Sequence, residues 1–220
     1  MALENNMSLV RIRSFLKEEL KEQILLEIAP ILHIGQSQGG YFGPSRQILC
    51  FVDFLGALYH GYDEKEDKKY LSRKSKTRTI SKPEHAVEFL KNIFGEKIDP
   101  NYRLEGETLF KMYRHGLVHL YQPKSFLQSN GRNLSWITYK GPRVGAYVRV
   151  GNTHVSGVGH MCLITHPEYE NWDYLAISIN CLYYDLIQAI DIYMGMIEQD
   201  VTLQEKFRLT ANAISEFEKL

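Results

Sequence analysis

The sequence predicts a mainly α-helical bundle of five or six helices, with a small antiparallel β insertion between the fourth and fifth helices. Two observations predict this fold class. Apolar residues recur at steps of three and four over long stretches, which is the spacing of amphipathic helices. Residues 130–166 instead contain short runs rich in Tyr, Val, Ile and Thr, which are typical of strands. The length of 220 residues suits one domain, residues 1–220, with the strands inserted in it.

The first two helices are expected at residues 8–27, or slightly beyond, and at residues 44–60. In the first, the apolar residues at helical spacing are Leu9, Ile12, Leu16, Leu20, Ile24 and Ile28. Pro30 is expected to end or kink this helix, because proline disfavours helical backbone at the residue before it. Pro44 suits the first turn of the second helix, and Gly61 suits its C-terminal cap.

The third and fourth helices are expected after a long hydrophilic stretch. Ser81 and Glu84 have the spacing of a capping box, and Gly95 is expected to end the third helix. The fourth helix is expected to start within residues 101–107 and to be stopped by Pro123. Its apolar stripe comprises Leu109, Phe110, Tyr113, Leu117, Leu120 and Tyr121.

The insertion and the last two helices follow. Residues 135–140 and 145–150 are expected to pair as antiparallel strands, and residues 161–165 suit a third strand. Residues 172–196 have the strongest helical pattern, so they are expected to form a central helix. A second capping box, residues 202–205, is expected to begin the final helix.

Composition limits the classes of function. The formal net charge is zero, so attraction to nucleic acid or to an acidic membrane must come from a local patch. No apolar run is long enough to span a bilayer, and the first residues lack a secretory signal. Three widely spaced cysteines form no Cys-x-x-Cys motif, and Cys50 and Cys181 are expected to be buried thiols. We therefore expect a reduced, cytoplasmic protein without a membrane partner.

Residues 113–119, Tyr-Arg-His-Gly-Leu-Val-His, concentrate more possible chemistry than any other segment. On an ideal helix, His115 and His119 project together from the side opposite the apolar stripe, and Arg114 lies at the edge of that stripe. An imidazole exchanges protons near neutral pH, and a guanidinium can hold a phosphate. An imidazole and a guanidinium are the smallest set of side chains needed to cleave a phosphodiester without a metal.

The segment resembles the Arg-x4-His motif of HEPN domains, the "higher eukaryotes and prokaryotes nucleotide-binding" helical bundles. Arg114 and His119 match the ends of the motif, and His115 stands in its polar position. The resemblance implies a metal-independent endoribonuclease without a cofactor, whose homodimer brings two motifs into one cleft. His119 would exchange protons with the ribose 2′-hydroxyl or the leaving 5′-oxygen, and Arg114 would hold the scissile phosphate. His115 would be a second acid–base group or an orienting group.

Other functions remain open at this point. The chain can be a non-catalytic helical module that binds nucleotide, RNA or a protein. It can also hold zinc through His115 and His119, four residues apart, with His154, His160 and His166 contributing. In purely structural roles, Arg114 would be a salt-bridged arginine and His119 a surface histidine.

Charged residues outside the motif are candidates as well. Within the hydrophilic stretch, residues 63–82, the basic residues Arg73, Lys74, Lys76 and Arg78 predict either an RNA-binding arm or a solvated loop. Asp53 and Asp185 interrupt the apolar surfaces of their helices. Each is expected to face a partner or to pair with a basic residue.

Overall fold

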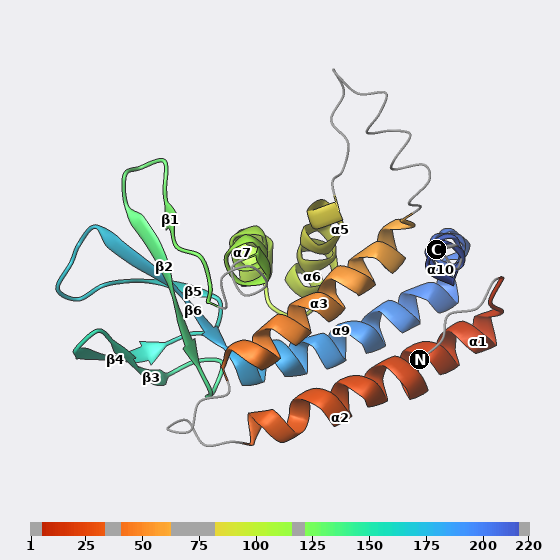
Figure 1. Cartoon of the computed structure of the whole chain (residues 1–220), viewed down its shortest axis with the longest axis horizontal. Coiled ribbons are helices and arrows are strands. Elements are labelled where there is room, and N and C mark those ends of the chain that lie inside the picture. Colours follow the sequence, from red (N-terminus) through yellow and green to blue (C-terminus); the bar gives the residue numbers. More distant parts are fainter. Residues whose placement is uncertain (1–5, 34–40, 63–81, 116–121, 216–220) are drawn as a thin grey trace, which may run out of the picture.

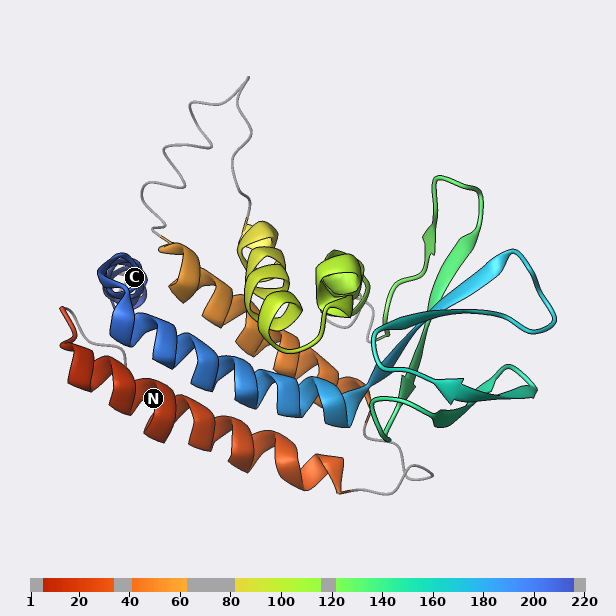
Figure 2. The same cartoon turned by 180° about the vertical axis from the view of Figure 1, so that it is seen from behind.

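A computed structural model of the chain describes residues 6–33, 41–62, 82–115 and 122–215. Helices form one bundle, and strands gather at one end of it (Figure 1). Turned by half a revolution, the molecule shows the same division, with the long helix α9 in the middle of the bundle (Figure 2). No helix within the described ranges is long and apolar enough to cross a membrane.

The first helix is one continuous rod whose middle widens into a π-helical segment, formed by α1 (Leu9–Ser14), η1 (Phe15–Leu20) and α2 (Lys21–Leu32). Ser8 begins it, and its side chain accepts a hydrogen bond of 3.2 Å from the Arg11 N–H. Pro30 lies inside α2 rather than after it, and the helix ends two residues later. A proline this near the end disturbs only the last turn.

The second helix confirms its predicted cap, whereas the third continues beyond its predicted end. Gly61 caps α3 (Phe42–His60) in the left-handed conformation, with φ of 85°. The third helix consists of α5 (Lys82–Phe89), η3 (Leu90–Phe94) and α6 (Gly95–Lys97). Gly95 keeps helical backbone, and a Cβ there would lie 2.8 Å from the Arg103 nitrogen. This glycine therefore serves close packing and not termination.

The remaining helices are α7 (Asn101–Leu109), η4 (Phe110–His115), α9 (Ile179–Gln199) and α10 (Val201–Ser215). Helix α9 is the core of the bundle: Leu182, Leu186, Ala189, Ile190 and Tyr193 are fully buried. The Asp200 carboxylate, and not the predicted Thr202, begins α10, because it accepts the Thr202 N–H at 2.8 Å.

The prediction of a mainly α bundle with a small antiparallel insertion is wrong. The strands are β1 (Phe126–Leu127), β2 (Asn133–Tyr139), β3 (Ala146–Val150), β4 (Thr153–Val158), β5 (Cys162–Thr165) and β6 (Trp172–Ser178). They form a four-stranded mixed sheet in the order β1-β2-β6-β5 and a separate β3–β4 pair. Strands β2 and β6 are parallel, with Trp136 opposite Leu175, whereas β1 and β5 are antiparallel to their neighbours. The chain is therefore an α+β protein.

The error has a physical cause in β6. Leu175, Ala176 and Ile177 are completely buried at the centre of the sheet, so their segment reads as an apolar run without the alternation of a half-exposed strand. Such a run cannot be distinguished by periodicity from the start of a buried helix. The predicted central helix therefore begins at Ile179 and not at Trp172. The predicted pairing of residues 135–140 with 145–150 is also wrong, since β3 pairs with β4.

A buried polar network joins the sheet to the bundle around Asp185 of α9. The Tyr102 hydroxyl of α7 donates a hydrogen bond of 2.7 Å to the Asp185 carboxylate. Arg143, in the connection between β2 and β3, donates to Asp185 and to Asp99. The prediction that Asp185 pairs with a basic residue is thus confirmed. Since a buried carboxylate is costly without such partners, these contacts fix the sheet on the helices.

His160 extends this network from the sheet side. Its Nδ1 accepts the Ser178 N–H at 3.0 Å, so the ring proton lies on Nε2. Nε2 is 2.8 Å from the Tyr102 hydroxyl, and it therefore donates to that oxygen. Burial is the main cause that lowers the pKa of His160, which is consistent with a neutral ring.

We predict that Tyr102→Phe destabilises the protein by about 1–3 kcal/mol, because it removes one buried hydrogen bond from the His160 Nε2–H and one from the Asp185 carboxylate. Urea denaturation measures this free energy of unfolding. Tyr147→Phe, which removes the hydroxyl of an exposed tyrosine, is the matched control and should change little. Equal effects of the two variants would contradict a structural role for the network.

Candidate functional site

The sequence motif is only partly within the described residues. Arg114 lies in η4, and His115 is the last residue of that segment. His119 lies outside the described ranges, as do the four predicted RNA-binding residues Arg73, Lys74, Lys76 and Arg78. The site is therefore built from Arg114 and its surroundings.

Arg114 contacts helix α3 through an ion pair with Asp53. Its Nη2 is 3.4 Å from the Asp53 Oδ2, longer than a usual charge-assisted hydrogen bond. Both side chains are partly exposed, at 27% and 33%. The Arg114 Nε is buried and has no hydrogen-bond partner among the described residues. The pairing expected of Asp53 is confirmed, and one guanidinium donor has no partner within the same ranges.

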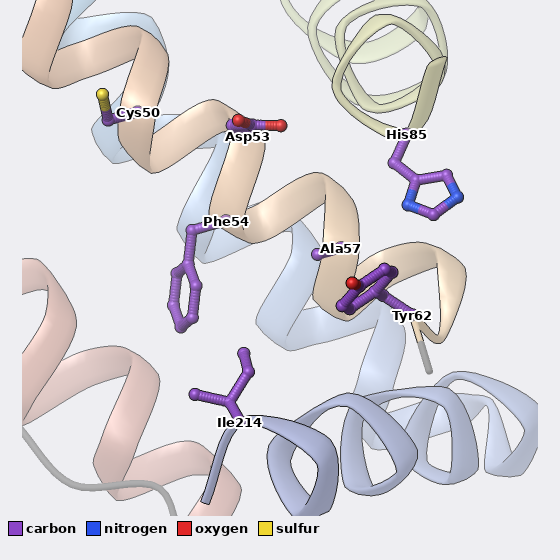
Figure 3. A pocket seen from close by; sticks show the side chains of 7 residues that line it. All are labelled: Cys50, Asp53, Phe54, Ala57, Tyr62, His85 and Ile214. Carbon is purple, nitrogen blue, oxygen red and sulfur yellow. The ribbon is translucent and has the colours of Figure 1, made fainter. Parts of the chain in front are cut away.

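A pocket of about 280 Å³ lies beside Asp53 on the part of α3 farther from the sheet (Figure 3). Four of the lining residues follow one another at helical spacing in α3, so their side chains lie on one face of that helix. The lining residues are Cys50, Asp53, Phe54 and Ala57 of α3, together with Tyr62, His85 and Ile214. Figure 3 shows Phe54 pointing toward Ile214, with Tyr62 and His85 at the other side of the pocket. Asp53 thus connects Arg114 to a cavity with aromatic walls.

Gly56 brings His85 to this pocket. A Cβ at position 56 would lie 2.7 Å from the His85 carbonyl oxygen and 2.8 Å from the Ala86 nitrogen. Helices α3 and α5 therefore pack backbone against backbone, which only glycine permits at this distance. This close crossing sets His85 beside the last turns of α3.

His85 presents a neutral aromatic ring. It stacks on His60 with ring centroids 4.2 Å apart, and Tyr62 meets it edge-on at 6.1 Å. Burial, followed by the neighbouring His60, lowers the pKa of His85 from 6.5 to about 4. At neutral pH the ring is uncharged, so it is suited to stacking more than to electrostatic binding of an anion.

The histidines proposed as zinc ligands in the strand region have separate surroundings. His154 is exposed and stacks on Tyr147, whereas His160 belongs to the buried network. The Nδ1 of His166 accepts backbone N–H groups of the turn that follows it, at 3.0 and 3.2 Å. Within the described ranges, no three side chains of His, Cys, Asp or Glu are arranged to hold a metal ion.

Sequence reasoning found Arg114 and marked Asp53 as unusual, but it missed the pocket. Cys50 was predicted to be buried and is exposed, because it lies on the face of α3 that borders the cavity; Cys181 is buried, as predicted. The spacing of Cys50, Asp53, Phe54 and Ala57 was the available signal. It describes one mixed polar and apolar helix face, which is unusual for a face that packs in a core.

We predict that His85 makes the folded state less stable as the pH falls from 6.5 toward about 4. In this window the unfolded chain gains a proton at His85 that the folded chain does not, so unfolding is favoured as acid is added. His85→Asn should flatten this part of the stability curve measured by urea denaturation. The exposed-histidine control His154→Asn should keep the parent slope, and an unchanged slope in His85→Asn would contradict the prediction.

Comparison with known proteins assigns neither a family nor a function to this site. No protein-family model, no curated protein and no solved structure matches the chain. The similarity of residues 114–119 to the HEPN motif therefore stays a prediction from the sequence.

Proposed function

We propose that the chain is a metal-independent endoribonuclease in which Arg114 holds the scissile phosphate and His119 transfers protons. The observation that carries the proposal is the hydrogen bonding and the exposure of the Arg114 guanidinium. Its one described ion pair is long, at 3.4 Å, and 27% of its side chain is exposed, whereas the Nε without a described partner is buried. A guanidinium in this state has donors left for a phosphate, which it prefers to bind through two of them.

The chemistry follows from the two side chains. His119 would take the proton of a ribose 2′-hydroxyl, which attacks the neighbouring phosphorus, or would deliver a proton to the leaving 5′-oxygen. Arg114 would stabilise the charge that grows on the phosphate in the transition state. His115 would be a second acid–base or orienting group. Asp53 would keep the guanidinium in position through its ion pair.

The proposal includes a homodimer. One chain supplies a single Arg114 and a single His119, and a two-fold axis near the motif would bring two sets of these groups into one cleft. Proton donor and proton acceptor could then come from different chains. Light scattering accompanies the activity test below, and a monomer that cleaves RNA would remove the dimer from the proposal.

We predict that the protein cuts single-stranded RNA in excess chelator and leaves 2′,3′-cyclic phosphate ends. DNA should survive, because it has no 2′-hydroxyl. His119→Ala should lower the rate roughly 10²–10⁴-fold, as expected for loss of a general acid or base. Arg114→Ala should also impair cleavage. Arg103→Ala is the matched control, since Arg103 lies on the same rod, α7, and its side chain is 65% exposed.

Several outcomes would count against the ribonuclease. Cleavage that is unchanged in His119→Ala would belong to another site or to a contaminant. Cleavage abolished by chelator and restored by zinc would favour a metal site. RNA binding without cleavage, weakened by charge reversal at Arg73, Lys74, Lys76 and Arg78, would favour a binding module.

A further inference from the structure

The pocket bordered by Asp53 combines three features that limit its ligand. Its volume of about 280 Å³ lies near the lower end of small-molecule sites, which suits one ring system with little attached. Phe54, Tyr62 and His85 give it aromatic walls, and Asp53 gives it a carboxylate. A small planar ligand with hydrogen-bond donors on one edge fits this combination.

We propose that this pocket binds a guanine base through the Asp53 carboxylate and the aromatic side chains of Tyr62 and His85. A carboxylate accepts hydrogen bonds at both oxygens and donates none. Guanine has two neighbouring donors on its Watson–Crick edge, N1–H and the 2-amino group, which match the two carboxylate oxygens. Adenine and cytosine place an acceptor beside their amino group, and uracil has a single donor between two acceptors.

The Arg114 ion pair is compatible with this role of Asp53. Two carboxylate oxygens offer about four lone-pair positions, so Asp53 can keep its 3.4 Å contact to Arg114 and accept from a base as well. Because the same carboxylate contacts Arg114 and borders the pocket, a phosphate held by Arg114 would lie next to the bound base. This placement rests on the proposed ribonuclease function, and it makes guanosine the nucleoside beside the cut.

The aromatic walls supply affinity and Asp53 supplies selectivity. The neutral ring of His85 is held in place by His60, which stacks on it, and by Tyr62, which meets it edge-on. Stacking on such a surface accepts any base, since every base has a flat face. Discrimination therefore depends on the donor edge that meets Asp53.

We predict that isothermal titration calorimetry on the full chain ranks GMP above IMP, and IMP above AMP. IMP retains N1–H but lacks the 2-amino group, so it should bind about 10-fold more weakly than GMP. AMP, with an acceptor facing the carboxylate, should bind about 10- to 100-fold more weakly than GMP. Asp53→Asn should remove most of the preference. Asp191→Asn, which removes a carboxylate on the outside of α9 that binds Lys21 at 2.7 Å, should leave it unchanged.

A second variant covers the case in which Asp53→Asn misfolds. Ala57→Leu enlarges a lining side chain on the next turn of α3, and it should weaken binding of all three nucleotides while circular dichroism stays that of the parent. Equal affinity for GMP and AMP, absence of saturable GMP binding, or an unchanged preference in a folded Asp53→Asn protein would overturn the guanine site.

The two proposals fail separately. Selective GMP binding that persists in His119→Ala, in a protein that never cleaves RNA, would support the pocket and remove the ribonuclease. Cleavage of RNA without preference for guanosine, together with no GMP binding, would remove the pocket and leave the ribonuclease. Cleavage that prefers guanosine in the parent protein, and that loses this preference relative to the other nucleosides in Asp53→Asn, identifies RNA as the source of the base, whereas tight GMP binding without effect on the preference of cleavage identifies a free nucleotide.

Discussion

The arrangement of the helical bundle and the strand region depends on the hydrogen bonds of the buried Asp185 carboxylate. A charge in the interior is tolerated only with close partners, and those partners come from different parts of the chain: Tyr102 from α7 and Arg143 from the strand region. Tyr102 in turn binds His160. In η4, which continues α7, the Tyr113 hydroxyl lies 2.9 Å from the Thr138 hydroxyl of β2. The continuous helix formed by α7 and η4, which carries Arg114, is therefore attached to the strand region near both of its ends.

This attachment explains why Arg114 is beside α3. Tyr113 is held by the sheet, and the next residue extends toward Asp53, which is 61 positions earlier in the sequence. About one turn further along α3, Gly56 lets α5 approach until His85 borders the same pocket. Helix α3 thus supplies the carboxylate of Asp53, and it gathers the cation of Arg114 and the ring of His85 through two different packing contacts. Chemistry at this place depends on tertiary structure more than on any local motif.

Features that depend on neighbouring residues in the chain could be predicted from the sequence. Periodicity located the helices, and the cap at Gly61 followed from the left-handed backbone that glycine tolerates. Strand β6 could not be predicted in this way, because a fully buried strand has the same apolar pattern as a helix start. The pairing of Arg114 with Asp53 was equally inaccessible, since spacing along the chain carries no information about which helices touch. Asp53 stood out only as a charge on an apolar helix face.

Nuclear magnetic resonance of the Arg114 side chain tests most directly whether this guanidinium binds phosphate. A 2′-O-methyl RNA oligonucleotide lacks the attacking hydroxyl and stays intact during the titration. We predict that the Arg114 Nε–H resonance shifts saturably as this oligonucleotide is added, because a phosphate bound to the exposed part of the same guanidinium changes the surroundings of the buried Nε. The Arg103 Nε–H resonance, on the exposed side of α7, should stay in place. A protein that binds the oligonucleotide while the Arg114 resonance does not move would contradict phosphate binding by Arg114.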